Sequence, residues 1–328
     1  MSPISAVMKN AARRWIRFWF ESEGMPQLRL FRVSFGILLA CFFATRTLDA
    51  VKYYGPEGML PLETLKSVID RKFITSIFYL WDSNAAVLLG HGLLVVASLA
   101  LAAGLAPRLA ALVIYVLHVS FNNRNPMIAY GFDKVITFFM LYLTFAWYSS
   151  DEREAPRGSW KHAISSVAWR LIQIQLCVIY LFSGTEKLKG QFWWRGEALW
   201  GVLANSQLSR FDFGWTAHFP LLLTLGVYAT LAFEIYFPVM VWSRRWKWPF
   251  LWMGVLLHVG IIIGMKLNYF GFVMILTYFV FFSRSEAQKT EAFVKGLFRR
   301  VLAGLLPRHF GREKTFKTSD GAPIHTVS

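Results

Sequence analysis

Apolar segments recur along this chain between short polar connections, and this pattern constrains the fold more than any other feature. Their bounds are residues 30–44, 85–105, 109–121, 127–147, 163–182, 219–242, 248–265 and 270–282. A helix of about 20 apolar residues crosses the hydrocarbon core of a membrane. The pattern predicts an all-α polytopic membrane bundle of about eight spans. The segments at 109–121 and 270–282 are short, so a seven- or nine-span count remains an alternative.

Composition and charge favour a membrane protein over a nucleic-acid binder. Hydrophobic residues make up 55% of the chain and charged residues 16%, whereas soluble domains carry about 25% charged residues. The net charge of +16 arises from Lys and Arg in the terminal regions and short loops. These basic residues are more numerous on the side of the two termini, which predicts that both termini are cytoplasmic. We therefore expect a multi-pass protein of a bacterial inner membrane that contacts lipids and binds no nucleic acid.

Three regions are expected along the chain. Residues 1–28 form a basic amphipathic arm suited to an anionic membrane surface. Residues 29–283 form the transmembrane domain, and residues 284–328 form a basic cytoplasmic tail. Neither a CxxC nor an HExxH pattern occurs, so the sequence predicts no metal site.

A cluster of ionisable side chains adjoins the fifth apolar segment. Glu186, Lys187 and Lys189 follow Gly184 just beyond residues 163–182. Charged groups are costly in hydrocarbon, so they mark a functional site or a membrane boundary. In one interpretation Lys187 acts as a base, because a poorly hydrated amine loses its preference for the charged form. In the other, Glu186 and Lys187 extend to the headgroups and anchor the helix end.

Polar residues also interrupt the chain after the third apolar segment. Asn122, Asn123, Arg124 and Asn125 precede Pro126, which disfavours helix at the residue before it. The amides can bond freed backbone groups in a tight turn between spans. Alternatively they form the polar wall of a cavity, where irregular backbone is tolerated at membrane depth.

Three further polar residues lie within predicted spans. Glu234 is expected to be protonated or paired, with Arg170, Arg32 or His258 as its partner. His258 by itself is typical of a hydrogen-bonded contact between helices. Gln175 is placed to hydrogen-bond across helices in the same way.

Taken together, these residues resemble the horizontally transferred transmembrane domain family, which is related to vitamin K-dependent gamma-carboxylase. The resemblance covers roughly residues 30–282. The residues that carry it are Arg32, the Tyr54-Gly55-Pro56-Glu57-Gly58 loop, Asn125-Pro126, the segment 175–187 with Gln175, Tyr180 and Lys187, then Trp194 and His258.

The resemblance implies a site and a ligand class. In the carboxylase, the lysine that aligns with Lys187 is the base that deprotonates vitamin K hydroquinone. Lys187 is thus the implied catalytic base, tuned by Glu186 or His258, and vitamin K hydroquinone or another quinol is the implied cofactor. Arg124 stands where the family pattern has His, so we retain only a quinone- or lipid-like ligand. The residues expected to bind it are Asn122, Asn123, Arg124, Asn125, Gln175, Tyr180 and Glu234.

Two other functions remain open from the sequence. A non-enzymatic membrane protein that matures, exports or confers immunity to a secreted peptide would use its outer loops to bind that peptide or a membrane protein partner. A transporter is suggested by Glu234 and Arg170 within predicted spans. If the protein is an enzyme, the expected activity is carboxylase-like and quinol-dependent.

Overall fold

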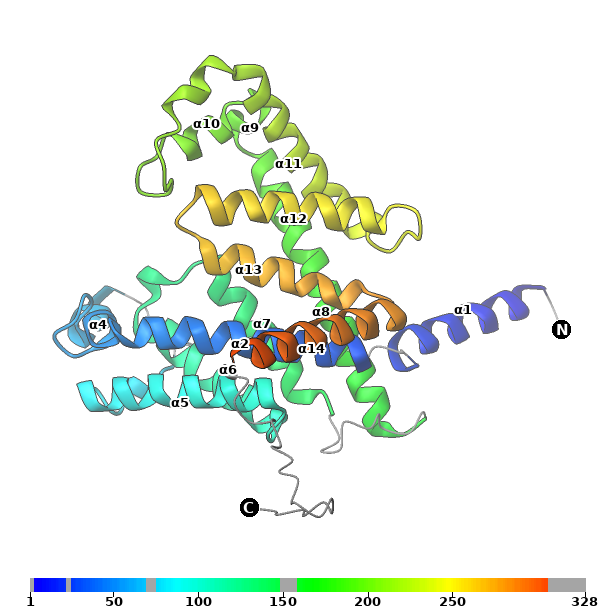
Figure 1. Cartoon of the computed structure of the whole chain (residues 1–328), viewed down its shortest axis with the longest axis horizontal. Coiled ribbons are helices and arrows are strands. Elements are labelled where there is room, and N and C mark those ends of the chain that lie inside the picture. The colour runs from blue at the N-terminus through cyan, green and yellow to red at the C-terminus, as the bar shows by residue number, and fades with distance from the viewer. Residues whose placement is uncertain (1–2, 22–24, 69–74, 148–157, 306–328) are drawn as a thin grey trace, which may run out of the picture. The chain divides into compact units, whose positions relative to one another are not determined.

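The computed structural model describes residues 3–21, 25–68, 75–147 and 158–305. The chain divides into two compact units, residues 1–287 and 288–328. Helices build nearly all of the described part of the first unit (Figure 1). Within these residues the only β-type pairing is an isolated bridge between Ser209 and Met265.

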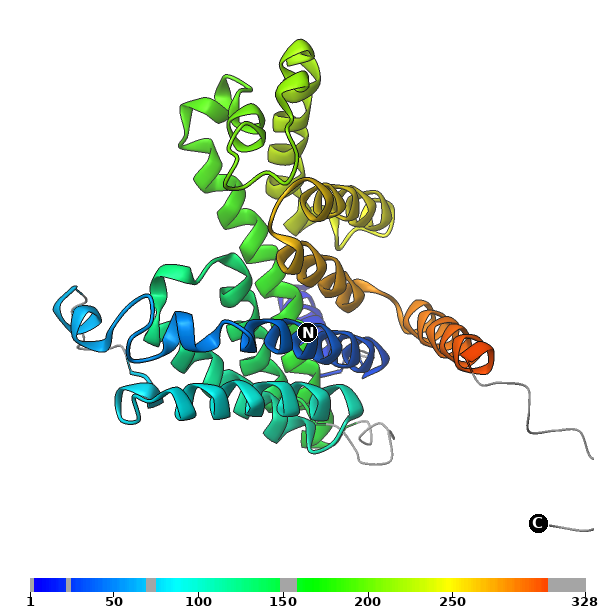
Figure 2. The same cartoon turned by 60° about the vertical axis from the view of Figure 1, so that its left-hand side comes forward.

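The first half of the chain packs long helices side by side. In both views α2 and α5 run alongside each other (Figures 1 and 2). Ser83 begins α5 by accepting a hydrogen bond from the Ala86 amide at 3.1 Å, and Pro107 begins α6 at a position where its missing N–H is not needed. The helices of this half are α1 (Pro3–Phe20), α2 (Met25–Thr47), α3 (Ala50–Tyr54), α4 (Leu62–Val68), η1 (Ile77–Tyr79), α5 (Asn84–Ala103), α6 (Pro107–Arg124), η2 (Pro126–Ile128) and α7 (Gly131–Phe145).

The second half begins with the longest helix, α8 (Trp160–Leu188), which packs against both halves of the bundle. Figure 1 shows α9 and α10 together beyond the end of α8, next to α11. The remaining elements are α9 (Gln191–Trp194), α10 (Ala198–Leu203), η3 (Gly214–His218), α11 (Pro220–Met240), α12 (Lys247–Gly264), α13 (Asn268–Thr277), η4 (Tyr278–Phe281) and α14 (Arg284–Leu305).

The prediction of an all-α membrane protein is confirmed at the level of fold class. Among the described residues, five helices are long and apolar enough, by length and composition, to cross a membrane: Pro26–Thr47, Asn84–Ala103, Trp160–Leu188, Pro220–Met240 and Lys247–Gly264. The other three predicted segments also fall on helices, α6, α7 and the α13–η4 pair. The predicted N-terminal arm contains α1, and the predicted basic tail from residue 306 onward lies outside the described residues.

Aromatic side chains fill the core between the helices. Phe31 and Phe35 of α2 are fully buried and both pack edge-on against Phe139 of α7. Such edge-to-face pairs add to the free energy gained from burying their area. On α8, the buried face carries Tyr180 toward α12 and η4.

Candidate functional site

The candidate site centres on an ion pair between α8 and α11. The Lys187 Nζ lies 2.9 Å from Glu234 Oε1 and 2.8 Å from Oε2. Ser183, one turn earlier on α8, accepts a third contact from Nζ at 2.6 Å and donates to Glu234 at 3.2 Å. Glu234 thus has a basic partner, one of the two alternatives predicted for it, but this partner is Lys187, and the predicted partners Arg170, Arg32 and His258 are wrong.

Both groups of the pair are shielded, although unequally. The Glu234 side chain is 8% exposed and the Lys187 side chain 23%. When an ammonium and a carboxylate are removed from water, each offsets part of the desolvation penalty of the other. Either group alone would keep its full penalty. The residual exposure leaves the amine reachable from outside the bundle.

A glycine permits this contact between the helices. A Cβ atom at Gly184 would lie 2.9 Å from the Ile235 side chain and 3.1 Å from the Glu234 Cβ. Small residues let membrane helices approach closely enough for polar side chains to meet. Gly184 therefore sets the spacing at which Lys187 reaches Glu234.

Aromatic residues of α9 lie beside the end of α8, and one of them contacts Lys187. The Lys187 Nζ lies 5.2 Å from the centre of the Trp193 ring, within range of a cation–π contact. The neighbouring Trp194 indole donates to the Leu188 carbonyl at 2.6 Å, and the Tyr228 hydroxyl donates to the Trp194 carbonyl at 2.6 Å. These bonds hold α9 over the end of α8.

Glu186 is not part of the pair. Its carboxylate lies 2.5 Å from the Lys189 Nζ, and the side chains of both residues are substantially exposed, at 47% and 71%. Exposed ion pairs of this kind stabilise a fold little. Of the two acidic residues near Lys187, only Glu234 meets it in a shielded place.

A second polar group continues along the same face of α8. The Tyr180 hydroxyl lies 2.8 Å from His258 Nε2 of α12 and 2.5 Å from the Tyr278 hydroxyl of η4. All three side chains are buried. His258 Nδ1 is also buried and has no hydrogen-bond partner among the residues the structure describes.

The group around Lys187 and the group around Tyr180 lie one after the other along α8 and form one polar row. Tyr180, Ser183 and Lys187 are spaced three and four residues apart, so they share a face of α8. The structure thus brings together four predicted site residues, Lys187, Glu234, Tyr180 and His258. Sequence reasoning missed Ser183 and Tyr278. Helical spacing from Lys187 would have found Ser183, whereas Tyr278 lies in an apolar run that gives no polar signal.

An apolar cavity of about 710 Å³ adjoins this row. Phe233 and Leu257 are among the residues that line it. The Phe233 ring also packs against the Tyr180 ring, with centroids 4.9 Å apart. Phe233 therefore contacts both the cavity and the polar row, while the next residue, Glu234, reaches Lys187.

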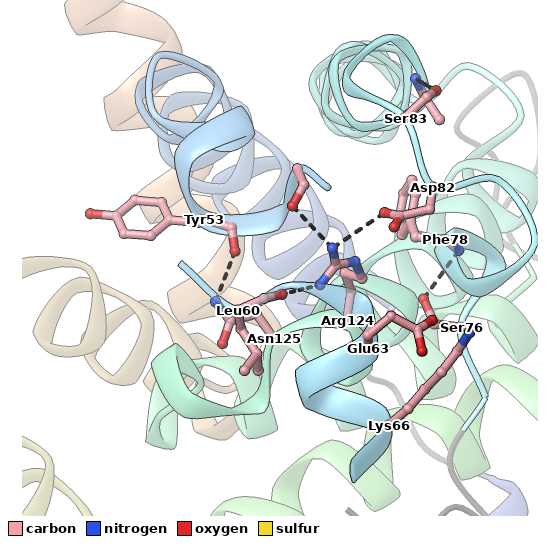
Figure 3. A network of polar contacts seen from close by, with 12 residues as sticks. Tyr53, Leu60, Glu63, Lys66, Ser76, Phe78, Asp82, Ser83, Arg124 and Asn125 are labelled. Carbon is pink, nitrogen blue, oxygen red and sulfur yellow. Dashed lines mark hydrogen bonds and ion pairs between the residues drawn. The ribbon is translucent and has the colours of Figure 1, made fainter. Parts of the chain in front are cut away.

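The polar segment at the end of α6 forms a different structure. Arg124 is completely buried, and its guanidinium donates to the Leu60 carbonyl at 2.6 Å, the Gly55 carbonyl at 3.0 Å and Asp82 Oδ1 at 3.2 Å (Figure 3). Asn125 donates to the Tyr53 carbonyl at 2.8 Å. These bonds clamp the loop between α3 and α4, so both side chains are engaged within the protein.

The two remaining asparagines lie in the last turn of α6. Asn123 donates from its side chain to the Thr75 carbonyl at 2.7 Å, and its own carbonyl accepts from the Tyr79 hydroxyl at 2.7 Å. Asn122 is half-buried. Figure 1 places α4, beside this turn, and α9, beside Lys187, on different sides of the bundle. The structure therefore does not bring this segment together with Lys187.

Gln175 and Arg170 also have partners within the bundle. Gln175 Oε1 accepts from the Tyr142 hydroxyl at 2.8 Å, which joins α8 to α7. Arg170 donates to the Phe18 carbonyl and to Gln173, each at 2.8 Å. Both residues thus serve contacts between or along helices.

The chain matches no protein-family model, and comparison with curated proteins and solved structures yields no match either.

Proposed function

We propose that this protein is an eight-span enzyme of a bacterial inner membrane, with both termini cytoplasmic, in which Lys187 accepts a proton from a quinone- or lipid-like ligand. The resemblance to the carboxylase-related family motivates the reaction class. The observation that carries the proposal is the shielded contact between Lys187 Nζ and Glu234, 2.8 Å across two helices.

The pair is suited to proton transfer. When Glu234 holds the proton that the two groups share, the Lys187 amine has a free electron pair. A bond then forms between this nitrogen and the proton of the ligand's acidic O–H group, whose electrons remain on the oxygen. Ser183, within 2.6 Å of the nitrogen, orients it. General bases of this kind contribute about 10²- to 10⁴-fold to a rate.

The apolar cavity supports a hydrophobic ligand. Its volume of about 710 Å³ falls within the range of about 300–1,000 Å³ typical of small-molecule sites. Its lining of aliphatic and aromatic residues such as Met253, Leu256 and Phe213 suits an apolar ring or tail. A quinol bound there would supply redox chemistry, while Lys187 and Glu234 would hold and move the proton.

The proposal is tested by quinol-dependent oxygen consumption and carbon dioxide incorporation in the purified full-length protein. Lys187→Gln should lower the rate at least 100-fold. Lys189→Gln is the matched control, because it removes the same charge from the same helix end at an exposed position. Equal rates in the two variants would remove the catalytic assignment.

A further inference from the structure

The cavity beside Phe233 has a polar neighbour at one end. The cavity lies among α10, α11 and α12, and Gly226, Ala229, Gly260 and Phe213 are among its lining residues. A second pocket, of about 420 Å³, adjoins it, and the two share Leu203 and Phe213. An apolar and a polar space therefore lie next to each other, as one molecule with an apolar and a polar part requires.

Two basic side chains line the second pocket. Arg210 and Lys266 face it together with Trp200 and Asp212. Asp212 Oδ1 accepts a hydrogen bond from the Gly214 amide at 2.7 Å, which engages this carboxylate in its own turn. In the part of the chain that the structure describes, no carboxylate lies within ion-pair distance of Arg210 or Lys266. The pocket therefore holds two cations and one carboxylate, a net positive charge, and neither cation is in an ion pair with a described residue.

Backbone hydrogen bonds join the segments that carry Arg210 and Lys266. The Arg210 amide donates to the Gly264 carbonyl, and the Lys266 amide donates to the Leu208 carbonyl, each at 2.8 Å. The Lys266 ammonium donates to the Ser206 carbonyl at 2.9 Å, and the Arg210 guanidinium contacts Asn268 Oδ1. All of these acceptors are neutral. The remaining N–H groups of both cations are available to a negatively charged ligand.

The apolar cavity also reaches the outer surface of α12. Leu256 and Ile263 line it and are 71% and 59% exposed. In a membrane, such side chains contact lipid tails rather than water. An apolar chain can thus enter the cavity sideways from the bilayer, while its head group stays at the end of α12.

We propose that the two pockets bind one anionic membrane lipid, with its apolar chains between α10 and α12 and its phosphate against Arg210 and Lys266. This inference rests on the ligand cavity of the proposed function, whose ligand is quinone- or lipid-like, and it names the class of lipid that the cavity and its charged neighbour fit. A quinone carries no charge to match the two cations. Hydrogen bonds from Arg or Lys to a phosphate are charge-assisted and about twice as strong as neutral ones.

Binding of two lipids with identical acyl chains tests the proposal without altering the protein. The probes are phosphatidylglycerol, which is anionic, and phosphatidylcholine, which is zwitterionic. Native mass spectrometry of the full-length protein in neutral detergent measures the retained fraction of each. We expect at least tenfold tighter binding of phosphatidylglycerol, and equal retention of both lipids would overturn the proposal.

Variants locate the bound lipid. Arg210→Gln with Lys266→Gln should abolish the preference, whereas Lys189→Gln with Arg195→Gln removes two charges outside both pockets and should preserve it. Gly260→Phe should weaken binding of both lipids, because a side chain at Gly260 meets no other atom within 4 Å and would project into the cavity. A preference that survives the first double variant would overturn the site.

The failure of this inference and that of the proposed function are distinguishable. Lys187 lines neither pocket, so Lys187→Gln should retain the preference for phosphatidylglycerol. Lipid preference without any quinol-dependent rate would refute the proposed chemistry and leave the lipid site standing. Menaquinone that displaces phosphatidylglycerol at equal concentration would refute the lipid site and leave the proposed chemistry standing.

Discussion

Lys187 and Glu234 are 47 residues apart in the sequence, yet their charged groups lie 2.8–2.9 Å apart between α8 and α11. The contact depends on Gly184, where a Cβ atom would crowd the side chains of α11, and on Ser183, which bonds to both partners. The pair is the shielded contact between an amine and a carboxyl group on which the proposed chemistry depends.

The pair should be coupled in stability. Lys187→Met and Glu234→Gln, made singly, should each lower the free energy of unfolding by about 1–3 kcal/mol, because each leaves a shielded polar group without its partner. The double variant should lose less than the sum of the two single losses. Thermal unfolding in detergent measures this. The exposed pair of Glu186 and Lys189 is the control, and comparable coupling there would contradict the account.

Arg124 should be required for the loop between α3 and α4. Arg124→Lys keeps the charge, but a lysine cannot direct a planar fork toward Leu60, Gly55 and Asp82 together. We expect a loss of about 2–4 kcal/mol in the free energy of unfolding and faster proteolysis of this loop. Lys66→Met is the control, since its pair with Glu63 is exposed (Figure 3). Unchanged proteolysis of Arg124→Lys would contradict the clamp.

The hydrogen bonds among Tyr180, His258 and Tyr278 should require a glycine at position 254. A Cβ atom at Gly254 would lie 2.0 Å from the Tyr278 hydroxyl, so Gly254→Ala must displace that side chain. Overpacking of this kind typically costs about 1–3 kcal/mol. Gly260→Ala on the same helix meets no atom within 4 Å and should be tolerated. Thermal unfolding of the two variants, compared side by side, tests the difference.

The contact between Glu286 and Lys247 predicts a dependence on pH. Partial burial raises the pKa of Glu286, but hydrogen bonds from Lys247 and Ser283 outweigh burial and leave this pKa below its usual value. A carboxyl group with a lowered folded-state pKa stabilises the fold above its unfolded-state pKa of about 4.3. This contribution is lost as the pH falls through the folded-state pKa.

The measurement compares thermal unfolding of the unaltered protein and of Glu286→Gln. The unaltered protein should be more stable at neutral pH, and the difference should disappear in strongly acidic buffer. Glu63→Gln, at an exposed position, should show little difference at either pH. A stability difference for Glu286→Gln that persists unchanged in acid would refute the role of the carboxylate.

The apolar runs were sufficient to predict the helices, because a span needs about 20 apolar residues whatever surrounds it. Each predicted segment falls on a helix, and five are long and apolar enough to cross a membrane. Lys187 was predicted as a candidate site residue because charged groups are costly near hydrocarbon. Those predictions depend on local sequence alone.

Partners across helices were not predictable in the same way. The sequence offered several basic residues as partners of Glu234. Lys187 is the partner because Gly184 lets α8 and α11 lie close together at this point. Arg170 instead contacts the Phe18 carbonyl of α1. Similarly, the turn at Asn122–Pro126 gave no sign that Arg124 would reach back to a loop more than 60 residues earlier. Such contacts depend on which helices pack together.

Chemical rescue of Lys187→Ala tests the central claim most directly. The quinol-dependent rate of this variant should fall at least 100-fold and recover in part when a small primary amine such as ethylamine is added. Lys189→Ala should show neither the loss nor the recovery. A Lys187→Ala variant that reacts as fast as the unaltered protein, without any amine, would contradict the assignment of Lys187 as the base.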